Sequence, residues 1–123
     1  MNWSAVGAIA LALAVMIGAF GAHALEGRLD VYSRGIYETG VTYHFFHALG
    51  LLIVSLLPRI GALSPTQASR VCLLLAVGIV LFSGSLYVLA ISGEKMLGAV
   101  TPFGGLSFIA AWVLLAYWLI RGA

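Results

Sequence analysis

The stretch VTYHFFHALGLLIVSLL, residues 41 to 57, points to the environment in which this chain folds. It contains no Asp, Glu, Lys or Arg, and it is close to the ~17–25 residues that a helix needs to cross the hydrocarbon core of a bilayer. Backbone groups in lipid must bond within their own segment, so a helix is the spanning form that fits this length. The stretch also carries His44 and His47, an unusual pair for a membrane segment.

Three further apolar segments accompany this one. The predicted spans cover about residues 3–24, 41–57, 69–92 and 102–120. Of the 123 residues, 63% are hydrophobic and 8% are charged, whereas soluble domains carry about 25% charged residues. A water-soluble fold of this size could not bury so much apolar surface. We therefore predict one integral membrane domain over residues 1–123, an all-α bundle of four transmembrane helices.

The segment between the first two spans is amphipathic. Leu25, Leu29, Tyr32 and Ile36 recur at helical spacing, with polar residues on another side. This pattern predicts a short amphipathic helix that lies along the membrane surface. The alternative is that the same residues extend the second span.

Helix boundaries also leave signals in the sequence. Ser64-Pro65-Thr66-Gln67 is a capping-box start for the third span, and Thr101-Pro102 resembles a start for the fourth span without the third-position partner. Gly93 is expected to end the third span, and Pro58 to close the second.

Small residues recur every four positions in the first span. Such ladders allow membrane helices to approach closely, within one chain or between copies in a homo-oligomer. The predicted packing residues are Ala10, Ala14, Gly18 and Ala22, with Gly104 and Gly105 in the fourth span.

Four spans place both termini on one side of the membrane and the links 25–40 and 93–101 on the other. His47 would lie only ~9 Å along a helix from Val41, near the interface. We therefore expect one polar cluster close to the link face. Its candidate residues are His23, Tyr43, His44, His47, Ser83, Ser85 and Thr101. Orientation stays open, because each side carries three Lys or Arg residues.

Four motifs resemble a known family. GAFGAHAL (18–25), YHFFHALGLL (43–52), LFSGSLYVLAISG (81–93) and LGAVTPFGGLSFIAAW (97–112) are similar to the small bacterial inner-membrane proteins of the YgdD and YwdK type. The resemblance implies a four-span helical protein of the inner membrane, with eukaryotic relatives, and supplies no established activity. It also implies that Gln often stands at the position of His44.

Four functional hypotheses follow. The favoured one is a non-enzymatic component that binds membrane lipids or a partner. A metal or haem site would use His23, His44 and His47. A small oligomeric transporter or channel would use hydroxyls of the third span. A membrane enzyme would use His47 near Tyr43 as an acid or base, although motifs such as HExxH are absent from the sequence. We predict no cofactor. We also predict no nucleic-acid partner, because the six basic residues are scattered.

Overall fold

The computed structural model describes residues 1–122, and these residues form helices, turns and short links without a strand. Four rods are long and apolar enough to cross a membrane, which confirms the predicted fold class. The α-helices are α1 (Trp3–His23), α2 (Val31–Leu56), α3 (Pro65–Gly78), α4 (Ser85–Ser92) and α5 (Thr101–Arg121).

Three short non-α segments complete the rods. A π-helix, η2 (Ile79–Gly84), joins α3 to α4, so these two helices form a single span. The 3₁₀ turns are η1 (Leu57–Ile60) after α2 and η3 (Lys95–Ala99) before α5. Wide π turns inside α-helices are rare and are often found at functional sites.

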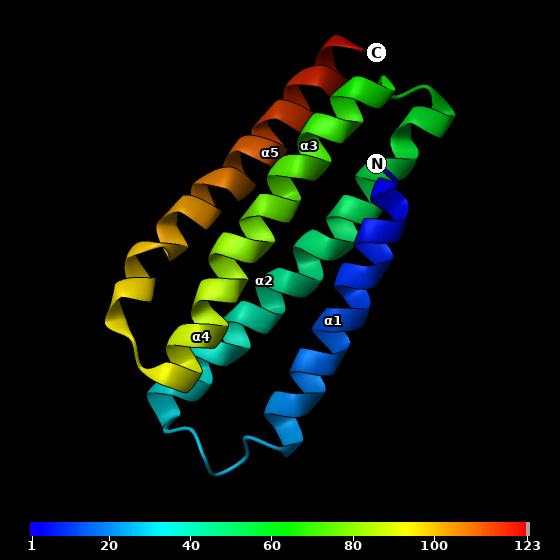
Figure 1. Cartoon of the computed structure of the whole chain (residues 1–123). Coiled ribbons are helices and arrows are strands. Elements are labelled where there is room, and N and C mark those ends of the chain that lie inside the picture. The colour runs from blue at the N-terminus through cyan, green and yellow to red at the C-terminus, as the bar shows by residue number, and fades with distance from the viewer. Residues whose placement is uncertain (123) are drawn as a thin grey trace.

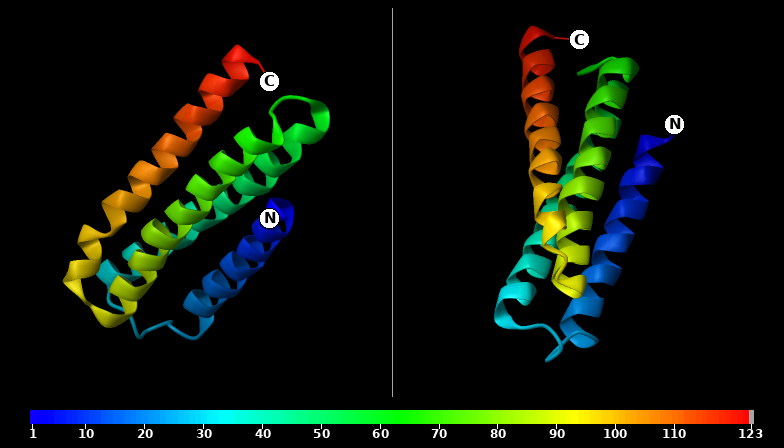
Figure 2. Two further views of the ribbon diagram at one scale, coloured as in Figure 1. Left: turned by 45° about the horizontal axis from the view of Figure 1, so that its top comes forward. Right: turned by 60° about the vertical axis from the view of Figure 1, so that its left-hand side comes forward.

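The rods run antiparallel to their sequence neighbours, and α2 is central (Figure 1). Helix α1 packs on α2, which also contacts α3, η2 and α4, while α5 packs on α3 and η2. Both ends of the chain lie at one end of the bundle, which we call the terminal end (Figures 1 and 2). The links 24–30 and 93–100 lie at the opposite end, the link end.

The core lies where α2, α3 and α5 meet. Its fully buried side chains include Leu51, Val54, Val71, Cys72 and Leu75. In contrast, large apolar side chains point outward along every span, among them Ile9, Phe46, Val80 and Ile109. Lipid is a good solvent for such surfaces, so the outward side chains need no protein partner.

The predicted surface helix between the first two spans does not form, and its alternative, an extension of the second span, is confirmed from Val31 onward. Residues 24–30 form turns, with Gly27 at φ +75°, a conformation that ends helical winding. Asp30 then caps α2, accepting a hydrogen bond from the Ser33 amide at 2.7 Å. This bond, together with one from the Ser33 hydroxyl, holds the pKa of Asp30 below its usual value. From Val31 onward the amphipathic residues extend the second span.

The predicted helix boundaries at Pro58, Ser64, Gly93 and Thr101-Pro102 are confirmed, but the role of Thr101 as a cap is not. The Ser64–Gln67 capping box starts α3, and Gly93, at φ +73°, ends α4. Thr101 is not a cap, because η3 leads directly into α5 and the Thr101 hydroxyl donates to the Leu97 carbonyl instead.

Candidate functional site

His44 and His47 lie in the middle of the membrane span. Two contacts fix the register of α1 on α2: Gly7 packs against Leu52, and Gly18 packs against Val41. Both histidines lie on α2 between these contacts, at the level of the central part of α1. This register places them level with the middle of α1, farther from the links than the sequence predicts.

His44 belongs to a polar group that joins three helices. Its Nδ1 lies 2.8 Å from the Tyr87 hydroxyl of α4, and its ring reaches the Ala10 backbone of α1. Beside them, the buried Ser83 hydroxyl donates to the Gly40 carbonyl at 2.7 Å. Polar groups thus hold α1, α2 and α4 together.

His47 faces a different neighbour. Its Nδ1 lies 2.7 Å from the Tyr43 carbonyl and must donate there. Its ring stacks on Phe108 of α5, with centroids 3.5 Å apart, and Trp112 lies next to it. The Tyr43 ring is exposed and packs against Phe82 at 4.5 Å. His47 therefore lies within an aromatic layer between α2 and α5.

A third polar group lies closer to the link end. The Ser85 hydroxyl lies 2.6 Å from the Thr101 hydroxyl and 2.9 Å from the Phe82 carbonyl, and its single proton can go to either oxygen. One turn further along α5, Gly104 touches the backbone of Phe82. The bond and the close contact fasten α5 to the π-helical turn.

The expected single cluster is therefore divided into separate groups. His23 is exposed at the end of α1, while His44 and His47 face different helices. Within residues 1–122, no three His, Cys, Asp or Glu side chains meet in a group that could hold a metal ion. The structure thus gives the three-histidine metal hypothesis no geometric support.

The predicted small residues of α1 lie along α2 at different degrees of burial. Ala14 is buried, Gly18 packs against Val41 and Ala10 is half-buried, whereas Ala22 is exposed and lines the cavity between the two helices. Gly7 and Gly21, which are not part of the predicted ladder, also face α2, against Leu52 and Tyr37. In the fourth span Gly104 is buried, and Gly105 is half-buried.

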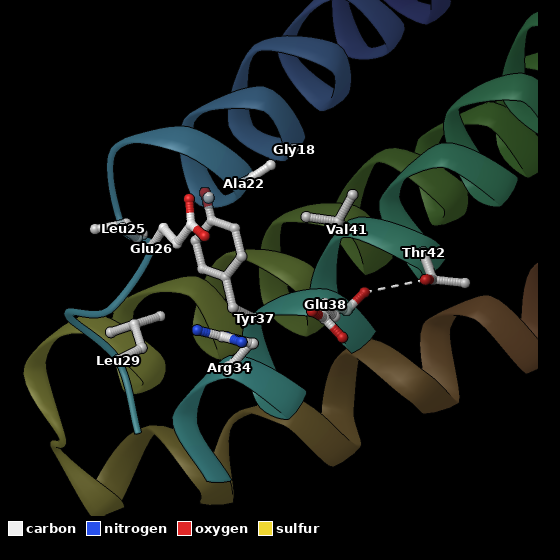
Figure 3. A pocket seen from close by; sticks show the side chains of 11 residues that line it. Gly18, Ala22, Leu25, Glu26, Leu29, Arg34, Tyr37, Glu38, Val41 and Thr42 are labelled. Atoms are coloured by element: carbon white, nitrogen blue, oxygen red, sulfur yellow. Dashed lines mark hydrogen bonds between the residues drawn. The ribbon is translucent and has the colours of Figure 1, made fainter. Parts of the chain in front are cut away.

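A cavity of about 520 Å³ opens between α1 and α2 toward the link end (Figure 3). Its inner wall is apolar and small, and its outer wall is charged. The inner residues are Gly18, Ala22 and Val41, and the charged ones are Glu26, Arg34 and Glu38. From Val41 to Arg34 the wall extends roughly 10 Å along α2 at ~1.5 Å per residue.

The charged groups of this cavity are not bonded to one another. Among the residues drawn in Figure 3, the hydrogen bond shown joins the Thr42 hydroxyl to the Glu38 carbonyl. Tyr37 lines the cavity as well, and its hydroxyl donates to the Ile17 carbonyl of α1. A guanidinium and two carboxylates thus remain available beside an apolar wall.

Arg34 and Glu38 lie outside the polar cluster that the sequence predicts. They stand one turn apart in a helical pattern that continues without a break into the second span. That continuity was the available signal. It shows that Glu38 lies less than one turn from Val41, at the edge of the apolar region.

Comparison with known proteins shows a clear relationship. A family model described as "Protein of unknown function (DUF423)" matches residues 17–105. The UPF0382 membrane protein YwdK of Bacillus subtilis is 47% identical, over 89% of each chain. The UPF0382 inner membrane protein YgdD of Escherichia coli is 41% identical, over 87% of this chain and 80% of its own. No solved structure matches. This chain belongs to the DUF423 family and is a multi-pass protein of the bacterial inner membrane.

Proposed function

We propose that this protein is a membrane component that binds one amphiphile, a membrane lipid, in the cavity between α1 and α2. The proposal rests on the change from apolar to charged lining along this cavity. Its inner wall is formed by Gly18, Ala22 and Val41, and its outer wall by Glu26, Arg34 and Glu38. A lipid has the same gradient, since its chains are apolar and its headgroup is polar.

The position of the cavity suits a lipid. Its charged end is formed by the link and the first turns of α2, which lie where a span leaves the hydrocarbon core. Its apolar end lies against the seam of α1 and α2 inside the span. A bound headgroup would meet Arg34 through its phosphate, since guanidinium groups form strong charge-assisted bonds with phosphate oxygens.

Unpaired carboxylates favour a headgroup that also carries a cation. Glu26 and Glu38 line the same outer wall as Arg34, so a purely anionic headgroup would be repelled by two of the three charges. An ammonium-bearing zwitterionic headgroup complements both signs. The lipid expected here is therefore an aminophospholipid.

The two mid-span histidines do not carry this proposal. Ionisable groups deep in a membrane often mark a transport pathway. Here, each imidazole is engaged inside the chain, His44 by Tyr87 and His47 by the Tyr43 carbonyl and the Phe108 ring. Their bonds support a role in joining helices.

The test fills the cavity from the wall of small side chains on α1. Ala22→Phe places a phenyl group at a lining position, whereas Ala19→Phe places it on the same helix outside the lining, where Ala19 is exposed. We expect Ala22→Phe to retain about tenfold less phosphatidylethanolamine, a change of ~1.4 kcal/mol, and Ala19→Phe to match the unmodified protein. Native mass spectrometry of the purified full chain counts the retained lipid. Equal retention by the two variants would contradict the proposal.

A further inference from the structure

The side-chain charges of the chain are divided unequally between the two ends of the bundle. All four acidic residues lie near the link end, together with three basic ones. They are Glu26, Asp30, Glu38 and Glu94. The terminal end has only basic side chains, Arg59, Arg70 and Arg121, in addition to the N-terminal amine. An anion approaching the terminal end therefore meets no side-chain carboxylate.

A second cavity, of about 690 Å³, lies at this basic end. Arg59, from the turn after α2, and Arg70, from the second turn of α3, both line it. Hydroxyl side chains line it too, and no carboxylate side chain does. Arg59 and Arg70 thus line one space from different parts of the chain.

Internal hydrogen bonds fix the wall of this cavity. The Trp3 indole donates to the Ser69 hydroxyl at 2.8 Å, and the Ser4 and Ser55 hydroxyls are 2.8 Å apart. These bonds connect α1 to α3 and to α2. Because they join three helices, the cavity keeps its shape without a ligand, which reduces the ordering cost of binding.

Arg121 provides a useful contrast at the same end. Its guanidinium donates to the Tyr117 hydroxyl and lies over the Tyr117 ring, and it does not line the cavity. At this end, Arg59 and Arg70 therefore line the same cavity, whereas Arg121 contacts Tyr117.

We propose that the terminal-end cavity binds a phosphate group through Arg59 and Arg70. Planar guanidinium groups offer paired N–H donors that match phosphate oxygens. The phosphate can belong to an anionic lipid headgroup or be free in solution, and the chemistry of recognition is the same. This site is separate from the cavity between α1 and α2, which lies at the other end and carries two carboxylates.

The experiment uses the full chain in nanodiscs of phosphatidylcholine, which carries no net charge. One probe is phosphatidylglycerol mixed into the disc, with its enrichment on the protein measured by native mass spectrometry. The other is inorganic phosphate, titrated by calorimetry. The double variant Arg59→Gln/Arg70→Gln removes both guanidinium groups, and Arg121→Gln removes one charge at the same end outside the cavity.

We expect the double variant to bind its probe about tenfold more weakly or worse, and Arg121→Gln to stay within about twofold of the unmodified protein. Enrichment of phosphatidylglycerol alone identifies a lipid as the source, and saturable binding of inorganic phosphate identifies a free anion. Either result supports the site. The proposal is overturned if the unmodified protein binds neither probe, or if the double variant and Arg121→Gln bind equally well.

A second variant covers the case in which the double Gln variant fails to fold, as judged by circular dichroism. Arg59→Lys/Arg70→Lys keeps both charges and loses the paired donors. We expect it to weaken binding about threefold. Unchanged binding would overturn a guanidinium site, because a general positive field would then account for the attraction.

Discussion

Two helix pairs meet the link end of the bundle in opposite ways. Helices α1 and α2 separate there and leave a cavity (Figure 1), whereas α5 stays in contact with the π-helical turn η2. Both pairs contain small residues, so composition alone does not explain the difference. The links do. Seven residues, 24–30, join α1 to α2, whereas α4 passes through Gly93 and Glu94 directly into η3.

The closed pair also has a glycine where the backbones touch. Gly104 lies against the Phe82 backbone, while on the open side Gly21 meets the Tyr37 ring, which stands between α1 and α2. An aromatic ring between two helices keeps them apart, and a glycine against a backbone brings them together. The cavity in this bundle therefore depends on the long link 24–30 and on the large side chain of Tyr37.

The largest effect is expected for Gly104→Ala, which tests the close contact between α5 and η2. Its new Cβ would lie 2.7 Å from the Phe82 Cα, and backbone cannot move away cheaply. We expect a loss of about 2–3 kcal/mol, read from thermal unfolding in detergent. The neighbouring Gly105→Ala is the control, because its Cβ would meet only the Phe82 ring, at 3.8 Å. Equal losses for the two variants would show that the seam is not closed at Gly104.

Tyr37→Phe tests the open pair. It removes the hydrogen bond from the Tyr37 hydroxyl to the Ile17 carbonyl and leaves the ring in place. We expect a loss of about 1 kcal/mol, with increased exchange of backbone amides at the end of α1. Tyr32→Phe, on the exposed side of the same helix, should change neither measurement. If both tyrosine variants behave alike, the hydroxyl does not hold the helices together.

The smallest effect is expected at the start of α2. Asp30→Ala removes the cap of this helix, so the link should fray slightly, whereas Asp30→Ser keeps a capping oxygen. The folded-state pKa of Asp30 is lowered by its bonds from Ser33, so the cap stabilises the fold above the ordinary Asp pKa of 3.8 and loses this effect as the pH falls through the lower, folded value. The protection factor of the Ser33 amide, measured by hydrogen exchange across that pH range, tests this role. A protection factor of the unmodified protein that stays constant as the pH falls would contradict it.

Local signals in the sequence predicted much of the fold. The capping box at Ser64 and the glycine stop at Gly93 depend on a few neighbouring residues, and both are confirmed. The break at Gly27 was missed, since the helical spacing of Leu25 and Leu29 suggested a helix through this glycine. The site was predicted less well. His44 and His47 were selected together, yet they face different helices, because the rotation of α2 depends on all its neighbours.

The lipid environment of this protein follows from its amino-acid sequence, because long apolar segments without charges are stable only in lipid. The sequence also determined four helices and a terminal end with only basic side chains. Only the tertiary structure decided the depth of the histidines, the opening between α1 and α2, and the meeting of Arg59 with Arg70 in one cavity. Hydropathy and caps act within a few helical turns. Register, depth and cavities depend on how whole helices slide and rotate against one another.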